Sequence, residues 1–191
     1  PFKPTDPTKI RMVNHGTAVR DRQLEKKIKA LQYADERFTL DFILLPAEPD
    51  YIDTLKALAE RLVPGRVTFH PPLPRSQILA RVAEYDLGIY IMAPVSYNDH
   101  MALPNRFFDF IAAGLAVCVG PSPAMKEIVE QYGVGIATPT FEEQDIGEAL
   151  NRLTADDIDH MKWASRAAVK HLNADTENQK WVALYRDLLG D

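Results

Sequence analysis

Residues 38–45 read FTLDFILL and give the clearest strand signal in the chain. Six of these eight residues are apolar, so the strand is mostly apolar along its length. A strand with this composition is typical of a parallel sheet that is covered by protein on both sides. We expect Pro46, which follows directly, to end the strand.

Short apolar runs alternate with helical patterns on both sides of this strand. They predict strands at residues 10–14, 66–69, 87–92, 116–119 and 134–137, and helices at residues 21–34, 50–62, 76–84, 104–113 and 124–131. His15, Gly16 and Thr17 are expected to break the first strand, Ser76 to cap one helix, and Gly114 to stop another. Residues 93–103 are expected to be a loop. The alternation predicts an α/β fold with a doubly wound, parallel six-stranded sheet and helices on both faces.

Beyond residue 140 the signal is helical, at residues 142–153, 155–171 and 175–189. Trp163 is expected to anchor its helix onto the core. On the predicted helix 21–34, Glu25 with Lys26, Lys27 and Lys29 is expected to form a solvated face.

Composition and charge exclude several classes of protein. The net charge of −5 comes without a basic stripe, which disfavours nucleic-acid binding. We find no signal peptide and no apolar stretch near the ~18 residues that span a bilayer. The single cysteine, Cys118, lies in an apolar run and is expected to be a buried thiol in a reducing, cytoplasmic compartment. No cluster has metal-ligand spacing, so we assign no metal and no cofactor.

Residues 1–8 are rich in proline and predict a linker that enters a domain at residues 9–191. We therefore expect the natural protein to extend further towards the N-terminus.

Four loops follow strands of the predicted sheet, at residues 15–22, 70–74, 93–105 and 120–125. In open α/β sheets, ligands bind beyond the carboxyl ends of the strands. Cations and amide or imidazole donors there suit an anionic ligand such as a diphosphate, although loops are polar in general. The charged and polar residues that these loops bring to this edge of the sheet are Arg20, Arg22, His15, His70, Arg75, Asn98, Asp99, His100, Asn105 and Arg106.

The segment 103–109 (LPNRFFD) is more specific. Pro104 at a first helical turn leaves the next backbone N–H groups free, and the helix dipole favours an anion there. Asn105 and Arg106 add side-chain donors, and Asp109 lies one turn further on the same face. A diphosphate at this tip would bring a ribose near Asp109. The alternative is an ordinary helix start. An aspartate near a helix start is common and worth only ~0.3–1 kcal/mol, and Arg106 could simply pair with it.

Several segments also resemble a known family. These are VTFHPP at residues 67–72, YDLGIY at 85–90, the block from LPNRFFD to Val119, EIV at 127–129 and GVG at 133–135. Their order resembles the C-terminal, donor-binding domain of GT-B retaining glycosyltransferases of group 1 (family 4), over about residues 10–189. The resemblance implies metal-independent transfer from a UDP- or GDP-sugar to an acceptor held by a second, N-terminal Rossmann-like domain.

The resemblance also implies roles for individual residues. Arg22 and Arg106 are the expected catalytic groups, which stabilise the leaving diphosphate. The implied substrate-binding residues, from the ribose carboxylate Asp109 to the base-flanking segment 70–73, are Gly16, Thr17, His70, Leu73, His100, Met101, Pro104, Asn105 and Asp109. The last helix is expected to pack on the missing N-terminal domain, through which any peripheral membrane contact would be made. Alone, this domain is expected to be inactive.

Two positions depart from the family pattern. Members often carry an acidic, sugar-contacting residue eight positions before the ribose carboxylate, and that position is Met101, beside Asp99 and His100. Thr17 stands where an arginine usually follows the glycine. Two alternatives therefore stay open: a non-catalytic nucleotide-binding or interaction module of the same fold, and a sugar-nucleotide epimerase-like domain.

Overall fold

In the computed structural model, which describes residues 2–172, six parallel strands form one sheet in the order β3-β2-β1-β4-β5-β6. The strands are β1 (Ile10–Ala18), β2 (Phe38–Pro46), β3 (Val67–His70), β4 (Leu87–Tyr90), β5 (Ala116–Val119) and β6 (Gly135–Ala137). The predicted doubly wound α/β fold is confirmed. The strand order reverses between β1 and β4, and ligands of open α/β sheets bind at such a switch point.

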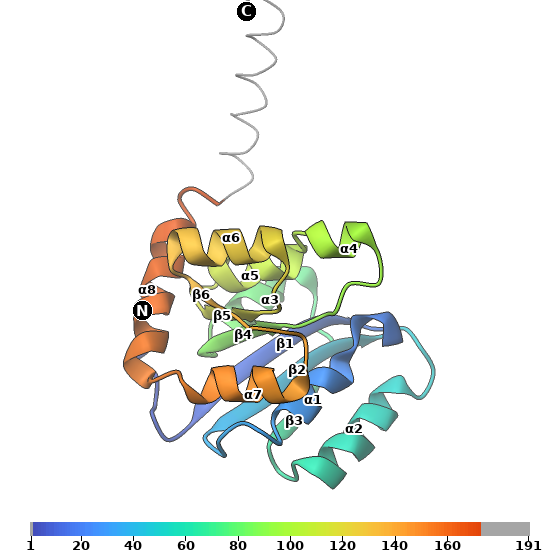
Figure 1. Cartoon of the computed structure of the whole chain (residues 1–191). Helices are drawn as coiled ribbons and strands as arrows, with labels where there is room; N and C mark the ends of the chain where they lie inside the picture. Colours follow the sequence, from blue (N-terminus) through green and yellow to red (C-terminus); the bar gives the residue numbers. More distant parts are fainter. Residues whose placement is uncertain (1, 173–191) are drawn as a thin grey trace, which may run out of the picture.

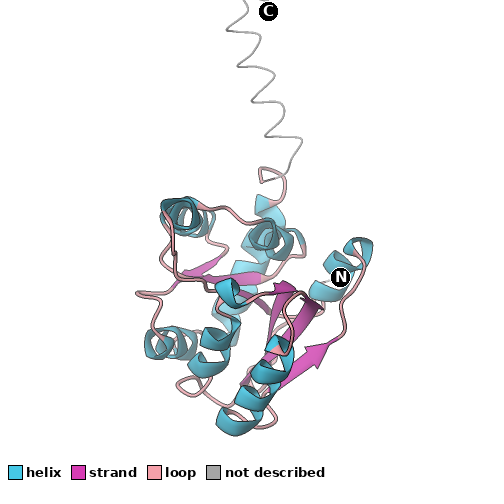
Figure 2. Cartoon of the chain, turned by 90° about the vertical axis from the view of Figure 1, so that its right-hand side faces the viewer, coloured by secondary structure: helices cyan, strands magenta, loops and turns pink. Residues whose placement is uncertain are grey.

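Helices cover both faces of the sheet (Figures 1 and 2). One face carries α1 (Leu24–Ala30), α2 (Tyr51–Leu62) and α7 (Glu143–Asn151), and the other carries α3 (Arg75–Val82), α5 (Asn105–Ala112) and α6 (Pro123–Tyr132). The helix α8 (Ala155–Ala168) packs along α5 and β5, and the short helix α4 (Tyr97–Met101) lies between β4 and α5 in the chain.

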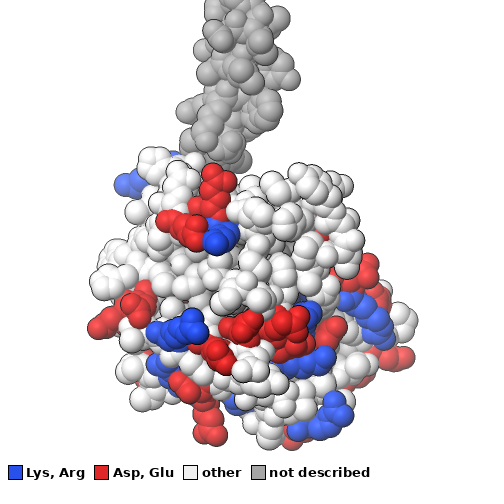
Figure 3. Space-filling model, in the orientation of Figure 1, with Lys and Arg blue, Asp and Glu red and all other residues white. Residues whose placement is uncertain are grey.

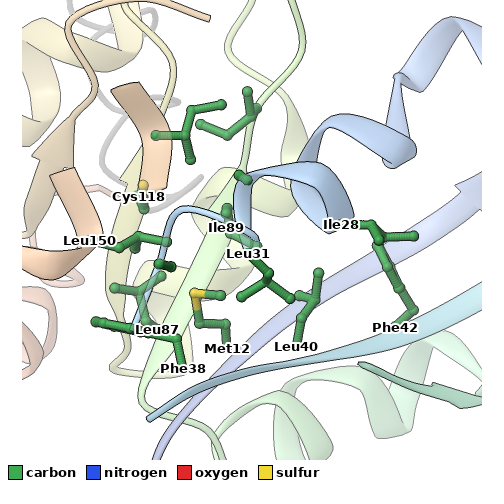
Figure 4. Packing of buried hydrophobic residues seen from close by; sticks show 14 of the residues in the cluster. Met12, Ile28, Leu31, Phe38, Leu40, Phe42, Leu87, Ile89, Cys118 and Leu150 are labelled. Atoms are coloured by element: carbon green, nitrogen blue, oxygen red, sulfur yellow. The ribbon is translucent and has the colours of Figure 1, made fainter. Parts of the chain in front are cut away.

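Alternation along the strands divides the core into two layers. Met12 and Cys118 pack towards α1 and α7, whereas their neighbours Val13 and Val117 pack towards α3, α5 and α6. Figure 4 shows the first layer, in which Cys118 lies near Leu150 and Ile89. Burial raises the pKa of the Cys118 thiol to about 12, so the thiol is protonated and unreactive near neutral pH. The predicted burial of Cys118 is confirmed.

The prediction that His15, Gly16 and Thr17 break the first strand is wrong. β1 continues through all three and pairs with β2 as far as Ala18, opposite Pro46. Gly16 takes a φ of 121° within the ladder, which a glycine adopts without steric cost. β2 ends at Pro46 as expected, with the proline as its last residue.

Two helix predictions also needed correction. The predicted helix 21–34 is a 3-10 turn, η1 (Arg20–Arg22), followed by the shorter α1, because Gln23 between them has a left-handed φ of 47°. Ser76 caps nothing, since α3 begins at Arg75 directly after Pro74. The predicted loop 93–103 contains α4, which is capped by the Ser96 side chain.

The first residues pack against α8. The Thr5 amide and hydroxyl both donate to Asp159 Oδ1, and the Phe2 ring stacks on Trp163 at 4.5 Å between centroids. Trp163 is 55% exposed, so the prediction that it anchors α8 onto the core is wrong. The linker boundary at residue 8 stays a prediction, and the predicted helix 175–189 lies outside the described residues. Within residues 2–172 no helix has the length and apolarity needed to cross a membrane.

Candidate functional site

Two pockets lie where the carboxyl ends of β1 and β4 meet the loops beyond them. The larger, about 320 Å³, is lined by Arg22, Tyr90, Asp99 and Pro104 among others. The smaller, about 210 Å³, is lined by His15, Gly16, Thr17, Leu73 and Arg75 among others. Five of the predicted site residues, Gly16, Thr17, Arg22, Leu73 and Pro104, therefore line one or the other pocket. A hollow of about 670 Å³ between α1 and α2 is lined by Arg20, which was expected at the ligand edge, but by none of the residues with a predicted catalytic or substrate-binding role.

The Arg106 guanidinium lies between the two pockets. Its Cζ is 5.4 Å from the centre of the Tyr90 ring, which lines the larger pocket. A Cβ added to Gly16, which lines the smaller pocket, would lie 2.5 Å from Arg106 Nη2, so a glycine is needed here to leave room for the guanidinium where it lies. Arg106 therefore lies against one lining residue of each pocket, although it lines neither pocket itself.

Arg106 is a buried cation without a counter-ion. It is 8% exposed, and no carboxylate of residues 2–172 lies within 4 Å of it. The alternative that Arg106 pairs with Asp109 is therefore not found. Burial, and then the charge of Arg22, lowers the Arg106 pKa to about 10, so the group is still charged at neutral pH. A buried charge of this kind is stabilised when an anion binds beside it.

Asp109 is instead held by Arg75. Two guanidinium nitrogens of Arg75 donate to the two Asp109 oxygens at 2.5 and 2.6 Å. Asp109 is buried, whereas the Arg75 side chain is 69% exposed, so Arg75 can move while Asp109 stays in place. The sequence placed Arg75 at the ligand edge but did not reveal this pair, because 34 residues separate the two.

His15 adds an unsatisfied polar atom to this corner. Its ring is buried against Phe110, and Nε2 lies 3.5 Å from Asp109 Oδ2 but has no hydrogen-bond partner in the described part of the chain. Burial, and then the charge of Arg106, lowers the His15 pKa to about 4. The imidazole is therefore neutral near pH 7, and the ring forms part of the lining of the smaller pocket.

Lys27 is a site residue that the sequence analysis missed. It was expected on a solvated face, yet it is only 2% exposed, because α1 turns it towards the sheet. Its Nζ donates to Ile91 O at 2.5 Å, Arg22 O at 3.4 Å and Gln23 O at 3.5 Å. Burial, and then Arg106, lowers its pKa to about 7. Lys27 thus ties the Arg22 turn to the end of β4.

Gln23 makes a second link between the same two segments. Its amide group accepts from Ala93 N and donates to Ala93 O, both at 3.1 Å. These bonds therefore hold the turn at Arg22 next to the start of the segment 93–103. Gln23 has a left-handed φ of 47°, and no sequence pattern predicted this contact.

The remaining predicted residues divide between the site and other roles. His70 donates or accepts at 2.8 Å with Asp41 and lines neither pocket. On α4, Met101 is 44% exposed and, like His100, lines neither pocket, whereas Asp99 lines the larger one. Asn105 is exposed at the first turn of α5, where the N–H groups of Asn105 and Arg106 have no acceptor among residues 2–172.

The comparisons with known proteins concern the fold. No protein-family model and no curated protein sequence matches the chain. Anabaena Alr3699/HepE in complex with UDP is similar at 19% identity over 94% of this chain and 49% of its own, with a TM-score of 0.74. WaaG, a glycosyltransferase of lipopolysaccharide biosynthesis, is similar at 15% identity over 88% of this chain and 44% of its own, with a TM-score of 0.69.

A separate domain structure covers both chains more evenly. The C-terminal domain of LpcC, a group 1 family glycosyl transferase from Francisella tularensis, is 15% identical over 87% of each chain, with a TM-score of 0.69. The chain thus spans about half the length of HepE and WaaG but most of this single domain. It has the Rossmann-like fold of GT-B glycosyltransferase domains.

Proposed function

We propose that this chain is the nucleotide-sugar-binding domain of a two-domain glycosyltransferase that transfers its sugar with retention and without a metal ion. The observation that carries the proposal is Arg106, a buried, charged guanidinium without a counter-ion, located at the first turn of α5 beside Arg22. Free backbone N–H groups at the same turn add partial positive charge. A diphosphate is an anion of the size and charge that such a tip accommodates.

The two pockets suit the two ends of such a donor. The smaller pocket has apolar walls at Ile43, Leu45 and Leu73 for a base, and Asp109 next to it can accept hydroxyl groups of a ribose. The exposed Arg75 side chain would then share Asp109 with the ribose or rotate towards the phosphates. The larger pocket, on the other side of Arg106, would hold the glycosyl group.

Positive charge at this tip also has a catalytic use. When the glycosyl bond breaks, the leaving diphosphate gains negative charge, which fixed cations stabilise without reorganisation. Arg22 and Arg106 would supply that charge, with Lys27 fixing the position of Arg22. The acceptor would come from a second domain, in line with the half coverage of HepE and WaaG. Because HepE binds UDP, UDP-sugars are the first donors to test and GDP-sugars the second.

Isothermal titration of the chain with UDP, GDP and their sugars tests the proposal. We expect at least one to bind, and Arg106→Met to weaken that binding roughly 10- to 100-fold, since a hydrogen bond to a charged group is worth ~1.5–3 kcal/mol. Arg61→Met on α2 is the matched control, because Arg61 lines only the hollow between α1 and α2. Folded protein that binds none of these ligands, or an Arg106→Met variant that binds normally, would refute the proposal.

A further inference from the structure

The walls of the larger pocket are unequal in polarity. Asp21, Arg22 and Asp99 supply its charged groups, whereas Met92, Val95 and Ala102 supply an apolar wall. The apolar side chains come from both ends of the segment that links β4 to α5. Figure 3 shows the same segment from outside as a largely uncharged surface over α4.

Part of the polar lining is already used within the protein. The Tyr90 hydroxyl donates to Met92 Sδ at 3.7 Å, and Asp99 Oδ2 accepts from the Ser96 hydroxyl at 2.8 Å. Met101, two residues after Asp99 on α4, is not among the residues that line this pocket. A hydroxyl group against the half-buried Met92 and Ala102 would lose bonds to water and gain none, which is unfavourable, whereas a methyl group would be favoured there. Val95, which is 79% exposed, forms the open edge of this wall.

We propose, on the basis of the function proposed above, that the larger pocket takes a deoxyhexosyl group, with a methyl group in place of a hydroxymethyl group against Met92, Val95 and Ala102. The remaining hydroxyl groups face Asp21, Arg22 and Asp99. A volume of about 320 Å³ lies at the lower end of small-ligand sites, which fits a single sugar ring.

The expected selectivity is moderate. Apolar pockets favour a ligand that matches them over one that carries an extra hydroxyl by roughly 10- to 100-fold, because the larger ligand still fits. The structure therefore predicts a preference within this range and not an absolute exclusion of the hydroxylated sugar.

Titration with donor pairs that differ by one oxygen atom tests the proposal. We would compare UDP-glucose with UDP-6-deoxyglucose and GDP-mannose with GDP-6-deoxymannose, with free UDP and GDP as references. The 6-deoxy sugar of the preferred base should bind 10- to 100-fold more tightly. The double variant Val95→Thr, Ala102→Ser should lose most of this preference while its affinity for the free nucleotide stays unchanged. Val67→Thr, the same isosteric change on β3 outside this pocket, should keep it.

The outcomes separate this inference from the function on which it rests. If the nucleotides bind but the hydroxylated sugar binds as tightly as its 6-deoxy partner, the deoxyhexosyl proposal is wrong and donor binding stands. If no nucleotide binds, both proposals fail. A preference that the double variant retains would also overturn the assignment of the apolar wall.

Discussion

At the scale of single residues, Gly16 controls where the Arg106 guanidinium lies. A Cβ at this position would meet Arg106 Nη2 at 2.5 Å, and a φ of 121° is strained for any other residue. We predict that Gly16→Ala displaces Arg106 and weakens nucleotide binding roughly tenfold or more, in addition to a strain of ~1–3 kcal/mol. Titration and urea unfolding of the same samples measure the two effects.

Gly65 provides the matched control for this change. It also has a positive φ, of 76°, but a Cβ there meets nothing within 4 Å. Gly65→Ala should therefore show the strain without the loss of affinity. Equal affinities of the two variants would contradict the assigned role of Gly16.

Lys27 makes the folding stability depend on pH. Its pKa falls from 10.5 to about 7 in the folded protein, chiefly through burial. Between these two values the unfolded chain binds more protons, so stability rises with pH across this window, and the full cost of the buried charge is present below pH 7. We predict that the stability of the native chain relative to Lys27→Met rises by roughly 1 kcal/mol per unit from pH 7 to 9. Urea unfolding at pH 7, 8 and 9 measures it.

Lys29, two residues along α1, has a side chain that is 43% exposed. A Lys29→Met variant should therefore show the same pH profile as the native chain. If the Lys27→Met profile also runs parallel to the native one, Lys27 is not titrating in this window.

At the scale of elements, the five-residue helix α4 carries Asp99 to the larger pocket. Its N-cap is Ser96, whose Oγ accepts from Asp99 N and donates to Asp99 Oδ2. We predict that Ser96→Ala removes about 1 kcal/mol from this helix and speeds amide hydrogen exchange across residues 96–103. The melting temperature should hardly change, because α4 contributes no buried residue.

Ser122 is a useful comparison, since it precedes α6 but makes no side-chain cap bond. Exchange in α6 should therefore be little affected by Ser122→Ala. Unchanged exchange in residues 96–103 of the Ser96→Ala variant would show that α4 does not depend on this cap.

At the scale of the whole molecule, the sequence predicted what local periodicity determines. Each strand between two helical layers must be apolar on both faces, which is why FTLDFILL and the runs near Leu87 and Ala116 could be recognised. The N-terminus of α5 could be predicted as a candidate anion site from Pro104 and the residues after it. What could not be predicted depends on contacts between distant segments: the burial of Lys27 against Ile91 and the Arg75–Asp109 pair. A lysine on an amphipathic helix and an arginine at the start of a helix carry no local signal of such partners.

The longest-range contacts join the first residues to α8 and to the start of β4. Lys162, which is 4% exposed, donates to Lys3 O, to Thr5 Oγ1 and to Asp86 Oδ1 at 2.6, 3.1 and 3.1 Å. Lys162→Met would leave Asp86 as a buried carboxylate without its cation, so we predict a loss of about 3 kcal/mol in the free energy of unfolding.

The exposed Lys56–Asp53 pair on α2 is the control, and Lys56→Met should change stability by less than about 0.5 kcal/mol. Since Asp86 lies at the amino end of β4, opposite the two pockets, nucleotide affinity should be unchanged in folded Lys162→Met. A stability loss no larger than that of Lys56→Met would show that this network does not hold the first residues to the domain.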